Sequence, residues 1–170
     1  MSSDWLSPGE ERRALGVLDA AFGIPPEALA GHRLLRRGQH VFAVRREAAG
    51  ACDAFRWVGA GLRLFKTSES GALKAATPGL QVFGRAATRR LCDLDGAALR
   101  ALLSRQSLPW AGEDGPILLR WQGSPLGLGL ARAGQLVSQL PRAVTEHLRV
   151  GGEASARPDG GSIWSSSTRP

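Results

Sequence analysis

Residues 117–137 read ILLRWQGSPLGLGLARAGQLV. The stretch holds three short apolar runs separated by two polar, glycine-containing steps: Ile117 to Trp121, Gln122-Gly123-Ser124, Leu126 to Ala131, Arg132-Ala133-Gly134 and Gln135 to Val137. Runs of this length bounded by glycine-containing turns are typical of short β-strands. The stretch therefore predicts three short strands and points to a small, strand-rich fold.

Similar signals continue upstream as far as residue 54. Strands are expected at residues 54–58 and 62–66 and extended chain at residues 87–94, with a turn at residues 67–71. Thr77-Pro78 can cap a short helix through Phe83 that Gly84 closes, and Asp95 can cap a second one with Leu99, Leu102 and Leu103 on its buried face. Many short strands with few helices between them favour a small mixed β-barrel.

The N-terminal part has a different pattern. Ser7 and Glu10 form a capping box with Pro8 at the first helical position, which predicts a helix over residues 8–22 that ends at Gly23. A break at residues 24–26 and a short helical turn precede two expected strands, at residues 32–35 and 40–44.

The expected fold class is therefore α+β, a small mixed β-barrel preceded by a small α/β extension. The 170 residues divide into the extension (1–52), the barrel domain (53–150) and a Gly-, Ser- and Pro-rich tail (151–170) that is predicted to be disordered. Trp164 in that tail is either an interaction anchor or an incidental aromatic residue.

The chain carries a formal net charge of +7, and the excess begins at residue 32. Residues 32–66 hold eight basic and two acidic residues, and between Lys66 and Arg90 the single acid is Glu69. Arginine outnumbers lysine 20 to two, a ratio that a GC-rich genome can also produce. The clustered excess favours a polyanionic partner.

Several classes of protein are excluded or disfavoured. No apolar run approaches the ~20 residues of a membrane helix, and the N-terminus lacks a secretory signal, so we expect a cytoplasmic protein without a membrane partner. The cysteines, Cys52 and Cys92, stand alone, and no histidine has metal-ligand spacing. We therefore expect no metal, no cofactor and no catalytic residues; a small hydrolase or transferase would need His40 or His147 beside a nucleophile.

Arginine and tryptophan are adjacent at Arg56-Trp57 and Arg120-Trp121, and the second pair is most simply an outward Arg beside a packed Trp. Gly127 and Gly129 do not fit a dinucleotide-binding loop, because Arg132 stands where its third glycine belongs. They allow a close approach either to another strand or to the backbone of a ligand.

Four segments also carry a family resemblance: VGAGLRLFK (58–66), LKAATPGLQVFG (73–84), GPILLRWQGSPLGLGL (115–130) and QLVSQLPR (135–142). In this order they resemble the PUA-like RNA-binding domain at the C-terminus of RsmF-type RNA cytosine-5 methyltransferases of the Nol/Nop/Sun family. The helix and the two strands before residue 45 are similar to the front of short, free-standing relatives. The Pro-Cys and Thr-Cys dipeptides of the catalytic domain are replaced by Ala-Cys at 52 and Leu-Cys at 92, and the chain is too short for a fold that holds S-adenosylmethionine.

The resemblance implies a non-catalytic protein that binds structured RNA (rRNA or tRNA), in rRNA modification, rRNA processing or ribosome biogenesis. It also implies the RNA-binding residues. Backbone amides around Thr77 and along Gly127 to Gly129 would approach the RNA, and nearby cations would neutralise phosphates: Lys66, Lys74, Arg85, Arg132 and Arg142. The alternative is a protein-interaction module that acts in trans with an RNA methyltransferase or a pre-ribosomal particle.

Overall fold

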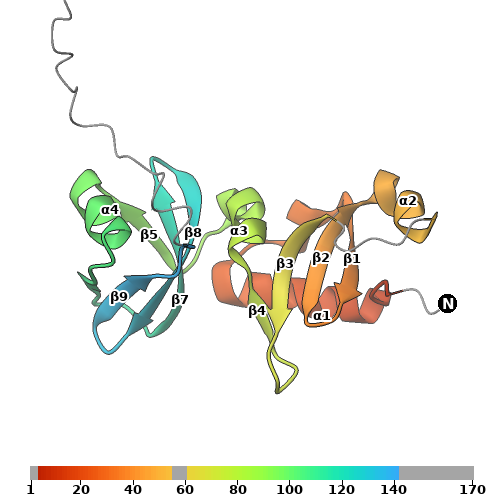
Figure 1. The fold of residues 1–170 in the computed structure, drawn as a ribbon, viewed down its shortest axis with the longest axis horizontal. Helices are drawn as coiled ribbons and strands as arrows, with labels where there is room; N and C mark the ends of the chain where they lie inside the picture. The colour runs from red at the N-terminus through yellow and green to blue at the C-terminus, as the bar shows by residue number, and fades with distance from the viewer. Residues whose placement is uncertain (1–3, 55–60, 142–170) are drawn as a thin grey trace, which may run out of the picture.

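The computed structural model describes residues 4–54 and 61–141. The fold is α+β, as expected, and contains two sheets (Figure 1). In chain order, with η for a 3₁₀ helix, the elements are α1 (Pro8–Phe22), η1 (Pro26–Leu29), β1 (His32–Arg37), β2 (His40–Arg45), η2 (Arg46–Ala48), α2 (Ala49–Ala54), β3 (Leu62–Thr67), β4 (Leu73–Ala75), α3 (Thr77–Phe83), η3 (Gly84–Ala86), β5 (Leu91–Leu94), α4 (Gly96–Leu103), β6 (Leu108–Pro109), β7 (Gly115–Trp121), β8 (Ser124–Arg132) and β9 (Gln135–Ser138).

Helix α1 has the ends that its sequence predicts. The Glu10 amide donates to Ser7 Oγ (3.3 Å), and Glu10 Oε2 accepts from the Ser7 amide (2.9 Å). The Ser7 amide, together with the Ser7 hydroxyl that donates to the same oxygen (2.8 Å), holds the pKa of Glu10 below its ordinary value. Gly23 ends the helix with φ 64°, a left-handed conformation that suits glycine. The reciprocal cap fixes where α1 begins and therefore which of its faces meets the sheet.

The first sheet has the strand order β1-β2-β3-β4, and every pair is antiparallel. Residues 4–6 extend it beyond β1, because the Leu6 amide donates to the Leu34 carbonyl (2.8 Å) and Trp5 forms a bridge with Leu35. One face packs against α1 and α3, with Leu34, Val41 and Phe65 in the same buried cluster as residues of both helices. The other face carries the residues that alternate with these along the strands.

A β-bulge in β3 decides which of its side chains reach the outer face. Val41 pairs with Phe65 and Phe42 pairs with Arg63, so Leu64 is the extra residue. Both Leu64 and Phe65 are buried in the core, whereas Arg63 and Lys66 on either side of them are exposed. The bulge thus turns two consecutive apolar side chains inward and leaves the flanking cations outside.

The second sheet has the order β5-β7-β8-β9-β6 and is curled (Figure 1). Strands β5 and β7 are parallel, and the other pairs are antiparallel. Helix α4 begins at the expected cap, with the Ala98 amide donating to Asp95 Oδ1 (2.7 Å). Its Leu99 and Leu102 join the buried cluster of this sheet.

Most of the expected elements are present within a residue or two of their predicted ends, but β5 begins only at Leu91, and β4 and β6 have no counterpart among the expected strands. Thr77 is the first residue of α3 rather than its cap, because Ala76 holds that position without a side-chain bond. Ala54 ends α2 instead of opening a strand. The first sheet takes strands from both sides of the division predicted at residues 52/53, since β2 pairs with β3. The helical turn expected from Pro141 onward, Arg142 and the tail lie outside the described residues, as do Arg56 and Trp57.

Candidate nucleic-acid interface

Four basic residues form one row across the outer face of the first sheet. Arg37 pairs with His40, His40 with Lys66, and Lys66 with Lys74, each as direct register partners on neighbouring strands. Residues directly opposite each other in an antiparallel pair project from the same face. We call these four residues the cation row; it lies at the end of the sheet where the β1–β2 and β3–β4 turns are.

The local chain explains how the row forms. The two-residue turn Gly38-Gln39, with Gly38 at φ 53°, makes the flanking Arg37 and His40 the closing pair of the hairpin. Lys66 and Lys74 face each other across the start of the longer β3–β4 turn. Four strands thus each contribute one side chain.

The members of the row differ in how they are held. Arg37 Nε lies 3.3 Å from Asp4 Oδ2, in an ion pair whose side chains are 35% and 47% exposed. The His40 ring meets Phe42 edge to face, with 6.2 Å between ring centroids, and its buried Nδ1 has no hydrogen-bond partner. Within residues 4–54 and 61–141, neither lysine forms an ion pair. The two ammonium groups are therefore available to an anion.

A hollow of about 510 Å³ adjoins the lysines at the β3–β4 turn. Its lining residues are Gln39, Lys66, Thr67, Ser68, Glu69, Ser70 and Lys74. Thr67 Oγ1 is buried without a hydrogen-bond partner, and the hydroxyls of Ser68 and Ser70 lie 3.0 Å apart. Ammonium and hydroxyl donors gathered in this way suit the oxygens of a phosphate.

The structure brings together only part of the expected site. Lys66 and Lys74 are neighbours, and Thr77 lies half-buried at the start of α3. Arg85 is exposed on η3, and Arg132 is exposed at the end of β8. Neither arginine belongs to the cation row.

Gly127 and Gly129 correct one expectation. Both are buried, so their backbone is not open to a strand of RNA. A Cβ added to Gly127 would come within 2.6 Å of Thr77 Cγ2 and 2.7 Å of Leu140 Cδ2. One added to Gly129 would come within 2.9 Å of Leu136 Cδ1. Of the two close approaches that the sequence left open, the one to neighbouring parts of the fold is therefore present.

Arg37 and His40 are members of the row that the sequence pattern did not assign to the site. Their signal was the pair of strands around Gly38-Gln39, because residues that flank a two-residue turn are register partners. Extending that register to β3 needs the position of the bulge at Leu64. That position follows from which apolar residues enter the core.

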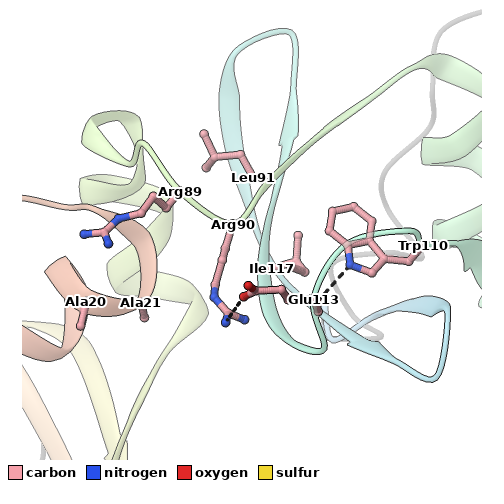
Figure 2. Close-up of a pocket in the computed structure, with 8 residues that line it drawn as sticks. All are labelled: Ala20, Ala21, Arg89, Arg90, Leu91, Trp110, Glu113 and Ile117. Carbon is pink, nitrogen blue, oxygen red and sulfur yellow. Dashed lines mark hydrogen bonds and ion pairs between the residues drawn. The ribbon is translucent and has the colours of Figure 1, made fainter.

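A second hollow, of about 580 Å³, lies between the end of α1 and the chain that leads into β7 (Figure 2). Its lining residues are Ala20, Ala21, Arg89, Arg90, Leu91, Trp110, Glu113 and Ile117. Arg89 Nη2 donates to the Asp19 carbonyl (2.8 Å), whereas Arg90 donates from Nη1 to the Asp114 carbonyl (3.1 Å) and from Nη2 to Glu113 Oε2 (3.0 Å). These consecutive arginines thus tie the segment before β5 to α1 and to the chain before β7.

Two neighbouring residues of β5, Asp93 and Cys92, have side chains whose pKa is set by their surroundings. Arg120, which pairs with Asp93 in β5–β7 register, donates from Nε to Asp93 Oδ1 (2.8 Å). Hydrogen bonding to Arg120 holds the pKa of Asp93 below its ordinary value. Burial raises the pKa of the Cys92 thiol, which disfavours the reactive thiolate. Among the described residues, no three His, Cys, Asp or Glu side chains gather as a metal site.

Among the helices of residues 4–54 and 61–141, none combines the length and the hydropathy of a membrane-spanning helix. In comparisons with known proteins, no family model matches the chain, and no curated protein matches it.

Proposed function

We propose that this protein binds RNA without altering it chemically, and that the cation row contacts the phosphates. The observation that carries the proposal is the register Arg37–His40–Lys66–Lys74, which aligns basic side chains from four strands on one face. Contacts to phosphate from several cations supply most of the sequence-independent affinity for nucleic acid. The neighbouring hollow, which both lysines line together with the hydroxyl residues Thr67, Ser68 and Ser70, supports the same chemistry.

The family resemblance refines the proposal. On it, the protein is a cytoplasmic relative of the PUA-like domain of RsmF-type methyltransferases, and its RNA is rRNA or tRNA. Its process is rRNA modification or ribosome biogenesis, with an RNA methyltransferase or a pre-ribosomal particle as partner. The support for this refinement is the order of the four sequence motifs. The support for RNA contact is the charge of the surface itself.

Fluorescence anisotropy with labelled tRNA and rRNA fragments tests the proposal on the full chain. The double variant Lys66→Gln/Lys74→Gln should bind at least about tenfold more weakly near physiological salt, and its log–log salt slope should fall by about 1.4, or about 0.7 for each phosphate that is no longer neutralised. The matched control is Arg12→Gln/Arg13→Gln. It removes the same charge from exposed positions on α1, which covers the opposite face of the sheet.

The outcomes separate the possibilities. Equal losses in the two double variants would mean that net charge alone drives binding and that the row is not the site. Failure of the wild-type chain to bind any of these RNAs would overturn the proposal. A protein partner retained after nuclease treatment and high salt, together with that failure, would identify an interaction module instead.

A further inference from the structure

A second row of side chains lies beside the cation row on the same face. Trp5 forms a bridge with Leu35, Leu35 pairs with Phe42, and Phe42 pairs with Arg63. Along β1 and β2 these residues are two positions from Arg37 and His40, a separation of roughly 7 Å. We call Trp5, Leu35, Phe42 and Arg63 the aromatic row.

In the aromatic row, the two half-buried rings pack on apolar side chains that are almost completely buried. Leu35 and Val44 are each only 3% exposed, and Trp5 and Phe42 pack against them. The two rings remain half-buried, while Arg63 is exposed. The Arg33 guanidinium carbon lies 4.5 Å from the centroid of the Trp5 ring, a cation–π arrangement. Ring faces and guanidinium planes are the groups on which nucleobases stack.

We infer that this face of the first sheet binds an unpaired RNA strand, with bases stacked on the aromatic row and the adjoining phosphates on the cation row. The inference rests on the proposed function and specifies its substrate. The cations on one side and the half-buried rings on the other identify the occupant as a polyanion with planar groups.

The geometry discriminates against a duplex. In paired RNA the bases are stacked on one another, and the A-form grooves present mainly phosphates, hydroxyls and base edges. A duplex can therefore meet the cation row but cannot place a base face on Phe42. An unpaired strand can make both contacts at once. A loop or a single-stranded end of a structured RNA satisfies the same requirement.

The test uses the full chain with three labelled RNAs of equal length: a single strand, a blunt duplex and a single strand with abasic sites. The wild-type protein should bind the intact single strand at least about tenfold more tightly than either of the others. Phe42→Leu should remove about that factor for the single strand alone and leave its salt slope unchanged, because the cations that meet the phosphates are still in place. Phe42→Trp should retain the affinity, and its fluorescence should be quenched on binding.

Equal affinity for the single strand and the duplex, or an equal effect of Phe42→Leu on both, would overturn the inference while RNA binding through the cation row stands. Absence of binding to all three RNAs would overturn the proposed function together with it. Phe42→Trp keeps an aromatic ring at the position, so loss of affinity in this folded variant would also contradict base stacking there.

Discussion

Lys66 and Lys74 are direct register partners in the β3–β4 hairpin, so two like charges stand side by side on an exposed face of the sheet. Like charges directly opposite each other destabilise an antiparallel pair. The pair therefore lowers the stability of the free protein, as residues retained for binding often do.

Replacing one of these lysines with an acidic residue should have opposite effects on the stability of the protein and on its affinity for RNA. We expect Lys74→Glu to raise the free energy of unfolding by about 0.5–1 kcal/mol at low salt, because repulsion becomes attraction. The same change should weaken RNA binding. Thermal unfolding and anisotropy measure the two effects, and the gain in stability should shrink in 1 M salt, where the charges are screened. A loss of both stability and affinity would show instead that Lys74 supports the fold.

The salt dependence of RNA binding should separate the row from the other expected cations. Lys74→Gln should lower the log–log salt slope by about 0.7. Arg85→Gln and Arg132→Gln should leave the slope unchanged, because these arginines lie on η3 and at the end of β8 rather than in the row. Binding curves from 50 to about 300 mM salt measure the slopes. If Arg85→Gln matches Lys74→Gln, the RNA extends over η3.

Gly127 should be intolerant of a side chain for reasons of packing. It has φ 143° and lies against Thr77 and Leu140, so Gly127→Ala should lower the free energy of unfolding by about 2 kcal/mol or more. The control is Gly16→Ala, at an exposed interior position of α1 where an added Cβ meets nothing within 4 Å. It should stabilise the chain by about 0.5–1 kcal/mol. Urea unfolding compares the two, and a neutral Gly127→Ala would contradict the close packing.

His32 should make the stability depend on pH. Its ring meets Phe83 edge to face (5.2 Å between centroids), and burial, with Arg45 nearby, lowers its pKa below the ordinary 6.5. Below pH about 6.5 the unfolded chain therefore binds a proton more readily than the folded chain does, so stability should decrease as the pH falls from there toward the folded-state pKa. Arg46 and Glu47 are the other charges that act on this ring.

His32→Gln, which cannot titrate, isolates this contribution. The difference in free energy of unfolding between pH 7.5 and pH 5.5 should be smaller in His32→Gln than in the wild-type protein. Urea titrations at the two values of pH measure it. An unchanged difference would show that His32 takes up a proton equally well in the folded and unfolded chain.

Arg90 should contribute to stability through the carbonyl that it binds more than through its ion pair. Arg90→Ala removes the bond to the Asp114 carbonyl and should cost about 1 kcal/mol. Glu113→Gln removes only the charge of a side chain that is 85% exposed, so its cost should stay below about 0.5 kcal/mol. Urea unfolding of both variants checks the order, and equal costs would assign the effect to the ion pair.

The features that could be predicted from the sequence are those that local chemistry decides. The capping box of Ser7 and Glu10, the cap at Asp95 and the glycine turns each depend on a few consecutive residues. The environment of Gly127 depends on Thr77, 50 positions earlier, and on Leu140. No local pattern contains that information, so the sequence was equally compatible with exposed and with buried positions for Gly127 and Gly129.

Only part of the candidate site could be predicted, because the rest of it depends on contacts between residues that are far apart in the sequence. Lys66 and Lys74 stand out as the two lysines of an arginine-rich chain with few acids nearby. Their alignment with Arg37 and His40 is a property of strand pairing. The bulge at Leu64 has a signal in the local sequence, because the consecutive apolar residues Leu64 and Phe65 interrupt the alternation of polar and apolar residues in this strand.

The antiparallel pairing of β2 with β3 has a practical consequence for anyone who shortens the gene. A fragment that starts at residue 53 would keep β3 and β4 but discard the neighbour that occupies one whole side of β3. The backbone N–H and C=O groups of β3 that lose their partners, together with the newly exposed Leu64 and Phe65, would pair with other copies of the fragment. Such a product should precipitate on expression, and of the four residues that we propose to contact RNA it would carry only Lys66 and Lys74.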